Sequence, residues 1–183
     1  MKRKSMIGAS VVCAMAGAAW GQTDLVANGG FETGAFGPEW TQFGDLGFTG
    51  VVTGGAQHSG TYVGEFGPTA VGGIQQTMTV GTGQQVLVSF WYRAGGATNS
   101  FYAKLGAETL VSFTNDTAHT AWTQFTFVTT TSGANPVLEF GFTNPPDYTY
   151  LDDVHVYSNG FGACCLGDGT CVVNTSAGCA AVG

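Results

Sequence analysis

The chain has 183 residues, of which only 9% are charged, and its formal net charge is −7. Three of its five basic residues, Lys2, Arg3 and Lys4, lie at the N-terminus, so the chain beyond them carries 2 − 12 = −10. Such an acidic protein repels phosphate backbones and anionic lipid headgroups, which argues against nucleic acid and membrane surfaces as partners.

Residues 1–21 have the pattern of a secretory signal peptide. The basic residues precede an apolar segment, 6–19, that is too short to span a bilayer, and Ala19 and Gly21 are small residues at the two positions that a signal peptidase recognises. We expect cleavage after Gly21, a secreted protein and no membrane association afterwards. The alternative is a lipoprotein anchored through Cys13, but that cysteine lacks the preceding Gly or Ala of a lipobox.

Residues 22–158 show period-two alternation of apolar and polar residues and no helical periodicity, which predicts one all-β domain. Strands are expected at 48–53, 61–65, 74–80, 86–93, 101–105, 110–113, 122–128, 137–142 and 148–157. Residues 106 and 107 would form a hairpin turn. About ten short strands predict a two-sheet antiparallel jelly-roll sandwich, because a single sheet would leave its apolar face uncovered.

The alternation also predicts which side chains form the core. In the 86–93 segment one face carries Val86, Val88, Phe90 and Tyr92, and the other carries Leu87, Ser89, Trp91 and Arg93. The remaining core candidates are Phe125, Phe127, Leu138, Phe140 and Phe142.

Residues 159–183 form a short Cys-rich appendix, in which no strand longer than 170–173 is expected. In a secreted protein Cys164, Cys165, Cys171 and Cys179 predict two disulfides, and pairing of the vicinal Cys164 and Cys165 would be strained. A zinc site is the alternative, against which stand the oxidising environment and the lack of paired CxxC motifs. A truncated repeat is one interpretation of the tail.

Two acidic segments frame the domain, NGGFETG at 28–34 and YLDDVHVY at 150–157. The first and last strands of a sandwich can lie side by side, so Glu32 and Asp152 or Asp153 would converge on one hard cation. Backbone carbonyls of the glycine-rich first segment would complete its oxygen shell. The sequence therefore predicts a structural Ca²⁺ ion. The alternative is that these acids are solvated turn and edge residues.

Several segments together resemble a known family. NGGFETG, HSGTYVGEFG, QQTMTV, VSFWYRAGG, NSFYAKLGAETLVSFTN and YLDDVHV are similar to the galactose-binding-like jelly roll of carbohydrate-binding module families four, nine and twenty-two. They are most similar to the variant in exported PEP-CTERM-type bacterial proteins. The resemblance covers about residues 24–158.

The resemblance implies a Ca²⁺ ion between the first and last strands. Glu32 and Asp152 would be its side-chain ligands, Gly30 a carbonyl ligand and residues 58–60 a further contributor. We prefer Asp152 to Asp153 because on a regular strand Asp152 shares a face with the apolar residues 154 and 156, which should point into the sandwich.

Sugar binding requires an aromatic ring that stacks on a pyranose and polar side chains that bind its hydroxyls. Trp91 and Arg93 supply both on one strand face. The supplementary candidates, from segments expected to border the same concave sheet, are Tyr102, His119, Trp122 and Gln124. An exposed Trp91 ring would favour sugar binding. A ring covered by loops would favour a structural or adhesive module of the extracellular matrix or cell envelope.

Catalysis has little support in the sequence. The three histidines lie in separate segments, there is no nucleophile elbow, and Glu65, Glu108 and Glu139 carry no glycosidase motif. We therefore expect a non-catalytic module that binds a polysaccharide or glycan. Cell-envelope or matrix proteins are the alternative partners, and a small hydrolase is the least favoured class.

Overall fold

The computed structural model describes residues 23–96, 98–158, 161–165 and 171–175, with side chains for the first two ranges only. All elements in these ranges are strands, and they include no helix that could cross a membrane. The predicted signal peptide, with Cys13, lies outside the described residues.

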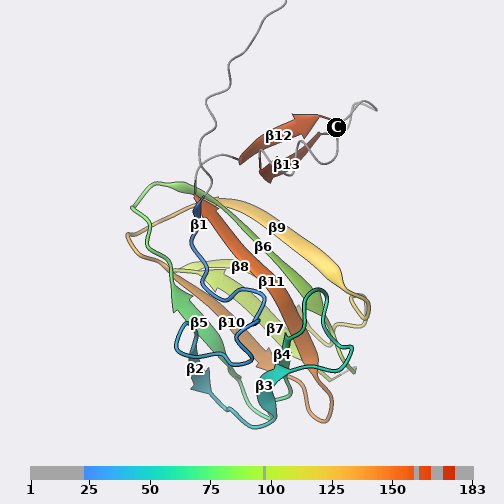
Figure 1. Ribbon diagram of the computed structural model, residues 1–183. Coiled ribbons are helices and arrows are strands. Elements are labelled where there is room, and N and C mark those ends of the chain that lie inside the picture. Colours follow the sequence, from blue (N-terminus) through green and yellow to red (C-terminus); the bar gives the residue numbers. More distant parts are fainter. Residues whose placement is uncertain (1–22, 97, 159–160, 166–170, 176–183) are drawn as a thin grey trace, which may run out of the picture.

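Two antiparallel sheets pack face to face (Figure 1). The six-stranded sheet contains, in spatial order, β3 (Thr49–Val52), β4 (Val63–Phe66), β11 (Thr149–Ser158), β6 (Gln85–Arg93) and β9 (Thr123–Thr130), and β1 (Thr23–Asp24) also pairs with β11. The five-stranded sheet contains β2 (Thr41–Gly44), β5 (Gly72–Thr77), β10 (Val137–Thr143), β7 (Ser100–Leu105) and β8 (Glu108–Thr114). The predicted all-β jelly-roll sandwich is confirmed, including the pairing of the first and last strands.

The core between the sheets is built from the alternating apolar residues. The predicted inward face of β6, ending at Phe90 and Tyr92, has no exposed surface, and Leu138, Phe140 and Phe142 of β10 are at most 1% exposed. Phe125 and Phe127 of the edge strand β9 are only partly buried but pack against this cluster. Each fully buried aromatic or aliphatic side chain contributes about 1.5–3 kcal/mol to stability.

The segment before β2 is anchored in the same core although it contains no regular strand. Phe31, Phe36 and Trp40 are at most 5% exposed, and the Phe31 ring lies edge-on to Phe36 at 5.6 Å between centroids. The Trp40 indole N–H donates to the Asn28 carbonyl at 3.1 Å. The glycine-rich first segment is therefore fixed by its aromatic residues.

Most expected strands are present within one or two residues, but β5 differs, and β1 and β2 were not predicted. β2 was not predicted, since three of its four residues are exposed and it shows no alternation. β5 ends at Thr77 rather than at residue 80, because the Met78 amide bonds to the Pro136 carbonyl outside the ladder. The predicted hairpin of β7 and β8 is confirmed, with Gly106 at φ 58° in its turn.

The tail contains a hairpin that the sequence did not predict. β12 (Phe161–Cys165) and β13 (Cys171–Thr175) are both five residues long and pair antiparallel, so the expectation of no strand longer than 170–173 is wrong. The side chains of Cys164, Cys165 and Cys171, and all of Cys179, lie outside what is described. Their disulfides stay a prediction.

Asp45 ties the turn after β2 to the turn before β5. Its Oδ1 accepts from the Gly47 amide at 2.9 Å, and its Oδ2 accepts from the Thr69 amide and hydroxyl and from the Ala70 amide at 2.8 to 3.0 Å. These donors, first the Gly47 amide, then the Ala70 amide and the Thr69 hydroxyl, lower the pKa of Asp45 to about 2.

We predict that Asp45→Asn lowers the melting temperature at neutral pH, because an amide nitrogen cannot accept these bonds. The folded-state pKa lies below that of the unfolded chain, so the stabilisation is present above about pH 4 and is lost as the pH falls toward about 2. Thermal melts followed by circular dichroism should show the difference from wild type closing over this range. A difference that does not depend on pH, or one equally present for the neighbouring Leu46→Ala, would contradict the prediction.

Candidate functional site

The predicted metal ligands lie at a bulge in β11. Leu151 and Val154 are both fully buried in the core, although residues three apart on a regular strand point to opposite faces. The bulge is located at Asp153, which has φ 46° and is the extra residue in the pairing of β11 with β6.

The bulge places Asp152 on the outer face of the sheet. Asp152 lies opposite Trp91, whose neighbours on β6 point into the core. The reason for which the sequence analysis preferred Asp152, a face shared with Val154 and Val156, is therefore wrong. Its side chain is nevertheless completely buried, because the loop at 53–61 covers it.

Asp152 is held by backbone amides. Its Oδ2 accepts from the amides of His58 at 2.9 Å and Ser59 at 3.3 Å, and its Oδ1 accepts from the Asp153 amide at 2.8 Å. Burial raises the pKa of this carboxyl to about 6, although the amides oppose the shift.

The structure brings Gly30, Glu32, Asp152 and Asp153 together. A methyl group placed on Gly30 would lie 3.6 Å from Asp153 Oδ1, 3.7 Å from Glu32 Cγ and 4.0 Å from Asp152 Oδ1. The three acidic side chains therefore surround one point, which a methyl group on Gly30 would reach at ordinary contact distances. We call Gly30, Glu32, Asp152 and Asp153 the acid cluster.

The donor set of the acid cluster suits a hard cation in part. Its side chains offer only oxygen ligands, the type that Ca²⁺ prefers. Asp153 is in addition paired with His58, at 2.6 Å between Oδ2 and Nδ1. Among the described residues no three His, Cys, Asp or Glu side chains are grouped so that they alone could hold a metal. A cation here would therefore need backbone carbonyls, as predicted for Gly30.

Glu32 also connects the first segment to the 53–61 loop. Its Oε1 accepts from the amides of Thr61 at 3.0 Å and Tyr62 at 3.1 Å. Gly60, with φ 61°, lies so close that a methyl group there would be 2.2 Å from Glu32 Oε1. Glycine is required at this position by both the backbone conformation and the space.

The Trp91 ring is covered. The His58 ring stacks on it at 3.7 Å between centroids and 16° between planes, and lies edge-on to Trp122 at 5.6 Å. Since His58 Nδ1 also contacts Asp153, this histidine joins the acid cluster to the aromatic rings. By the criterion stated above, a covered ring at this position favours a structural role for Trp91.

Four of the six predicted sugar-binding residues lie together on the outer face of the six-stranded sheet. Gln124 lies opposite Trp91 in the ladder, and the Arg93 guanidinium lies 5.2 Å from the Trp122 ring centroid. Arg93 also lies over Tyr150, at 4.3 Å, which the sequence analysis did not identify. Tyr150 is opposite Arg93 on β11 and so shares its face.

His119 lies elsewhere, which corrects its expected place beside Trp91. Its Nδ1 is 2.7 Å from Asp116 Oδ2, and its ring packs against Phe113 and Phe125 at the margin of the core.

Tyr102 lies on the other sheet, and not on the sheet of Trp91 as expected. Its neighbours Phe101 and Ala103 are buried, so its ring is on the outer face of the five-stranded sheet. The hydroxyl donates to Glu139 Oε1 at 2.7 Å, and the Lys104 ammonium lies 4.3 Å from the ring centroid. Burial first, and then the carboxylate of Glu139, raise the pKa of Tyr102.

Tyr102 belongs to a row that crosses all five strands. Successive ladder partners on this outer face are Phe43, Gly73, Gly141, Tyr102 and Ser112, which we call the glycine row. A methyl group on Gly141 would lie 2.2 Å from Tyr102 Cζ, so the ring lies flat over that glycine. Phe43 and Tyr102 are three strands apart, about 14 Å, because neighbouring strands are about 4.8 Å apart.

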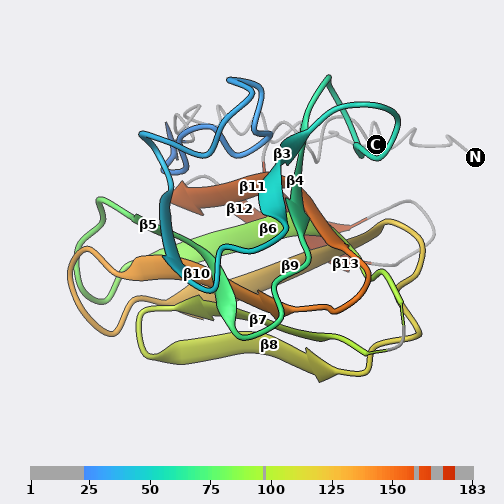
Figure 2. The same ribbon diagram turned by 90° about the horizontal axis from the view of Figure 1, so that it is seen from below.

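A second row beside it is entirely polar: Thr41, Gln75, Glu139, Lys104 and Thr109. Figure 2 shows that the segment at 25–40 and the loop at 53–61 lie on the side of the six-stranded sheet, and that no described segment covers the outer face of β7 and β8. The five-stranded sheet therefore presents two aromatic rings and several hydrogen-bonding side chains without an overlying loop.

The sequence analysis missed Phe43, Gln75, Glu139 and Lys104 as site residues. A signal existed for Glu139, because alternation in 137–142 places it on the face opposite Phe140. None existed for Phe43, which lies in a short strand that alternation does not reveal.

No family model matches the sequence, and no curated protein is similar to it in sequence. Its structure is similar to TmCBM61, solved in complex with beta-1,4-galactotriose, with a TM-score of 0.59 and 20% identity over 75% of this chain and 99% of that one. A family 16 carbohydrate-binding module gives 0.53 and 18%, over 72% and 98%. The chain has the galactose-binding-like jelly-roll fold.

The galactose-binding-like fold also occurs in an enzyme. The Stig cyclase Fisc from Fischerella sp. TAU has a TM-score of 0.56 at 12% identity, over 76% of this chain and 98% of that one. The fold alone therefore does not decide between binding and catalysis.

We predict that Gly60→Ala destabilises the protein by about 1–3 kcal/mol, because it strains the backbone and displaces the Glu32 carboxylate. Urea denaturation would measure the change. Gly83→Ala is the matched control, since its φ is also positive, at 72°, and nothing lies within 4 Å of a methyl group there. Equal effects of the two substitutions would show that the contact with Glu32 is not needed for stability.

Proposed function

We propose that this protein is a secreted, non-catalytic carbohydrate-binding module whose sugar site is the glycine row on the five-stranded sheet. The observation that carries the proposal is the pair of partly exposed rings, Phe43 and Tyr102, which lie on the outer face of that sheet on either side of Gly73 and Gly141. Gly141 lets the Tyr102 ring lie close against the sheet, and the two rings supply stacking surfaces for the C–H faces of a pyranose.

The polar row supports the same ligand class. Gln75 has a donor and an acceptor, Lys104 has donors, and Glu139 keeps acceptor capacity beyond its bond from Tyr102. On its own strand each of these residues is two positions from a member of the glycine row, so it lies on the same outer face. The carbohydrate-binding modules that share the fold are consistent with this function.

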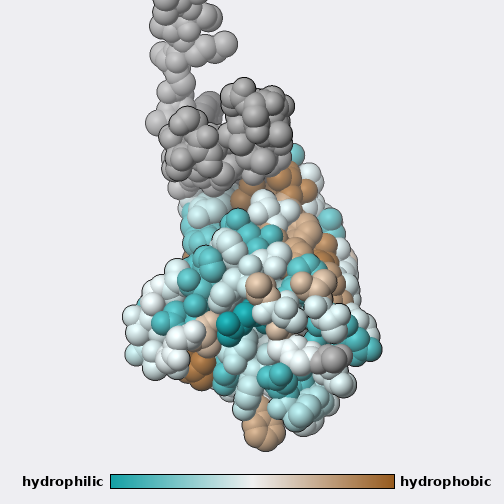
Figure 3. Space-filling view, turned by 90° about the vertical axis from the view of Figure 1, so that its right-hand side faces the viewer, coloured by the Kyte–Doolittle hydropathy of each residue, from teal (hydrophilic) through white to brown (hydrophobic). Residues whose placement is uncertain are grey.

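A structural or adhesive module is the second candidate, because His58 covers Trp91. On the face seen in Figure 3, which views the molecule from the β9 side, apolar surface is broken into separate patches by hydrophilic and neutral surface. That face therefore offers no broad apolar contact for a protein partner.

The test is binding of uncharged oligosaccharides, including beta-1,4-galactotriose and xylohexaose, by calorimetry, together with pull-down on insoluble polysaccharides. We expect modest affinity, with Kd about 1 μM to 1 mM. Tyr102→Ala should abolish binding, whereas Tyr102→Phe should retain it, because the ring remains. Gly141→Ala should weaken it by moving the ring.

Trp91→Ala identifies the sheet that binds. Loss of binding with Trp91→Ala and not with Tyr102→Ala would move the site to the six-stranded sheet. No binding across both panels would favour the structural module.

We also propose that the acid cluster holds one Ca²⁺ ion, with carboxylate oxygens of Glu32 and Asp152 and the Gly30 carbonyl as ligands. The ion would neutralise acids that have only His58 as a basic partner among the described residues. Its chemical contribution is structural: it would fasten the first segment to β11.

Calcium should therefore raise the melting temperature relative to a chelator. A bound ion adds about 2.7 kcal/mol at a hundredfold excess over Kd. Asp152→Asn should remove the shift and Glu108→Gln, on the edge strand β8, should keep it. Identical melting curves in calcium and chelator for the wild type would contradict the proposal.

A further inference from the structure

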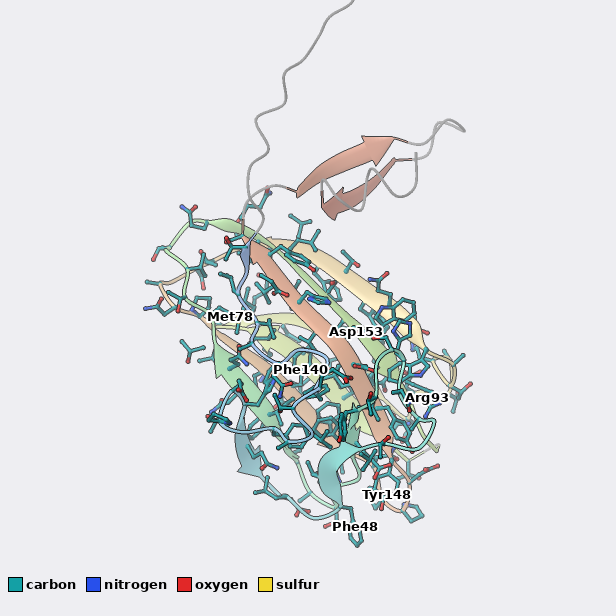
Figure 4. The ribbon with its side chains drawn as sticks, in the orientation of Figure 1. Phe48, Met78, Arg93, Phe140, Tyr148 and Asp153 are labelled. Carbon is teal, nitrogen blue, oxygen red and sulfur yellow. The ribbon has the colours of Figure 1, made fainter. Side chains whose placement is uncertain are left out.

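A pocket lies at the end of the sandwich where the turns after β2, β4 and β10 meet. Its volume is about 320 Å³, and its wall includes Phe48, Thr69, Pro145, Asp147 and Tyr148. Figure 4 shows Phe48 and Tyr148 at the lower end of the molecule, below Arg93 and Asp153. The pocket is therefore separate from the acid cluster, and none of its residues belongs to the glycine row.

One wall of this end pocket is an aromatic ring that the fold does not bury. Phe48 is 68% exposed, the most exposed of the large apolar side chains described, and does not belong to the core cluster. Its φ of 55° is uncommon for a residue with a bulky side chain. The Gly67 amide, which donates to the Phe48 carbonyl at 2.8 Å, and the Asp45 network hold the turn in this conformation.

The opposite wall is equally fixed. Asp147 Oδ2 accepts from the Gly96 amide at 2.7 Å and Oδ1 from the Tyr148 amide at 2.8 Å. A methyl group on Gly67 would lie 2.9 Å from Tyr148 Cδ1, so glycine lets that ring lie against the pocket floor. The turns that carry both rings are thus fixed before any ligand arrives, which reduces the entropy lost on binding.

The lining selects a class of ligand. Two rings and two prolines give apolar surfaces of the kind that the C–H face of a pyranose covers. The Asp147 carboxylate can accept from sugar hydroxyls, and the pocket wall contains no basic side chain, which disfavours uronic acids and other anions. A volume near the lower end of the range for ligand sites, about 300–1,000 Å³, suits one sugar unit rather than the middle of a long chain.

We propose that the end pocket is a second binding site, which takes a terminal, uncharged sugar unit between Phe48 and Tyr148. The ligand class rests on the carbohydrate-binding function proposed above, but the site does not depend on the glycine row. A chain end bound here and a chain segment bound on the sheet would give the protein two points of attachment to one polysaccharide surface.

The test is a titration of the isotope-labelled secreted chain with methyl glycosides of glucose, galactose and xylose, followed by amide chemical shifts. Glucuronate is the anionic comparison and indole the apolar one. We expect saturable shifts in residues 45–48, 67–70 and 145–148 with at least one neutral glycoside, and weaker shifts with glucuronate. Phe48→Ala and Tyr148→Ala should each weaken that binding by about tenfold or more.

Leu46→Ala is the matched control, because Leu46 is 47% exposed in the same turn and is not part of the pocket wall. It should leave the shifts unchanged. Shifts only at the glycine row, abolished by Tyr102→Ala, would overturn the second site and support the first. Shifts with indole alone would contradict the proposal that the ligand is a sugar. No shift at the end pocket or at the glycine row, together with no binding of any oligosaccharide, would overturn both proposals.

Discussion

The extra residue in β11 is the constraint on which the arrangement of this molecule depends. β4 and β1 pair with the same edge of β11, but along β11 the pairing with β4 stops at Leu151 and the pairing with β1 starts only at Tyr157. The bulge at Asp153 lies in the gap between them, and there the Val154 amide bonds to the Gly29 carbonyl at 3.0 Å. A methyl group on Gly29 would lie 1.9 Å from the Val154 carbonyl oxygen, so the first segment can close this gap only with glycine.

The two sheets differ in whether a loop covers their outer face. The loop at 53–61 folds over the outer face of the six-stranded sheet, where its His58 amide binds Asp152 of β11 and its His58 ring stacks on Trp91. The aromatic residues of this face are consequently engaged with the protein's own side chains. The five-stranded sheet has no such loop among the described residues, and there Tyr102 is held by its hydrogen bond to Glu139 and by the Lys104 ammonium over its ring.

Period-two alternation predicted which face of a strand points into the core, and little else could be predicted from the sequence. The inward faces of β6 and β10 are correct because apolar residues alternate along both strands, and the alternating residues are the ones that the two sheets bury. The outward direction of Asp152 was not predictable, because a bulge changes the period without changing the composition. Placing Tyr102 and Trp91 on different sheets required strand order, which local pattern does not contain. His58 was noted only as part of a loop, and its stacking on Trp91 depends on how that loop closes.

The distribution of charge narrows the kind of ligand that any site of this protein can take. Arg93 and Lys104, the basic side chains of the described residues other than histidine, lie over aromatic rings, and the ion pairs found there all join a histidine to an aspartate. Several other carboxylates accept hydrogen bonds from backbone amides, as those of Asp45 and Asp147 do. Such a surface gives an anionic polymer no cluster of cations to bind, whereas neutral hydroxyls find carboxylate acceptors beside rings. The acidity therefore favours an uncharged polysaccharide, and specificity among neutral sugars has to come from the shape of the rings and glycines.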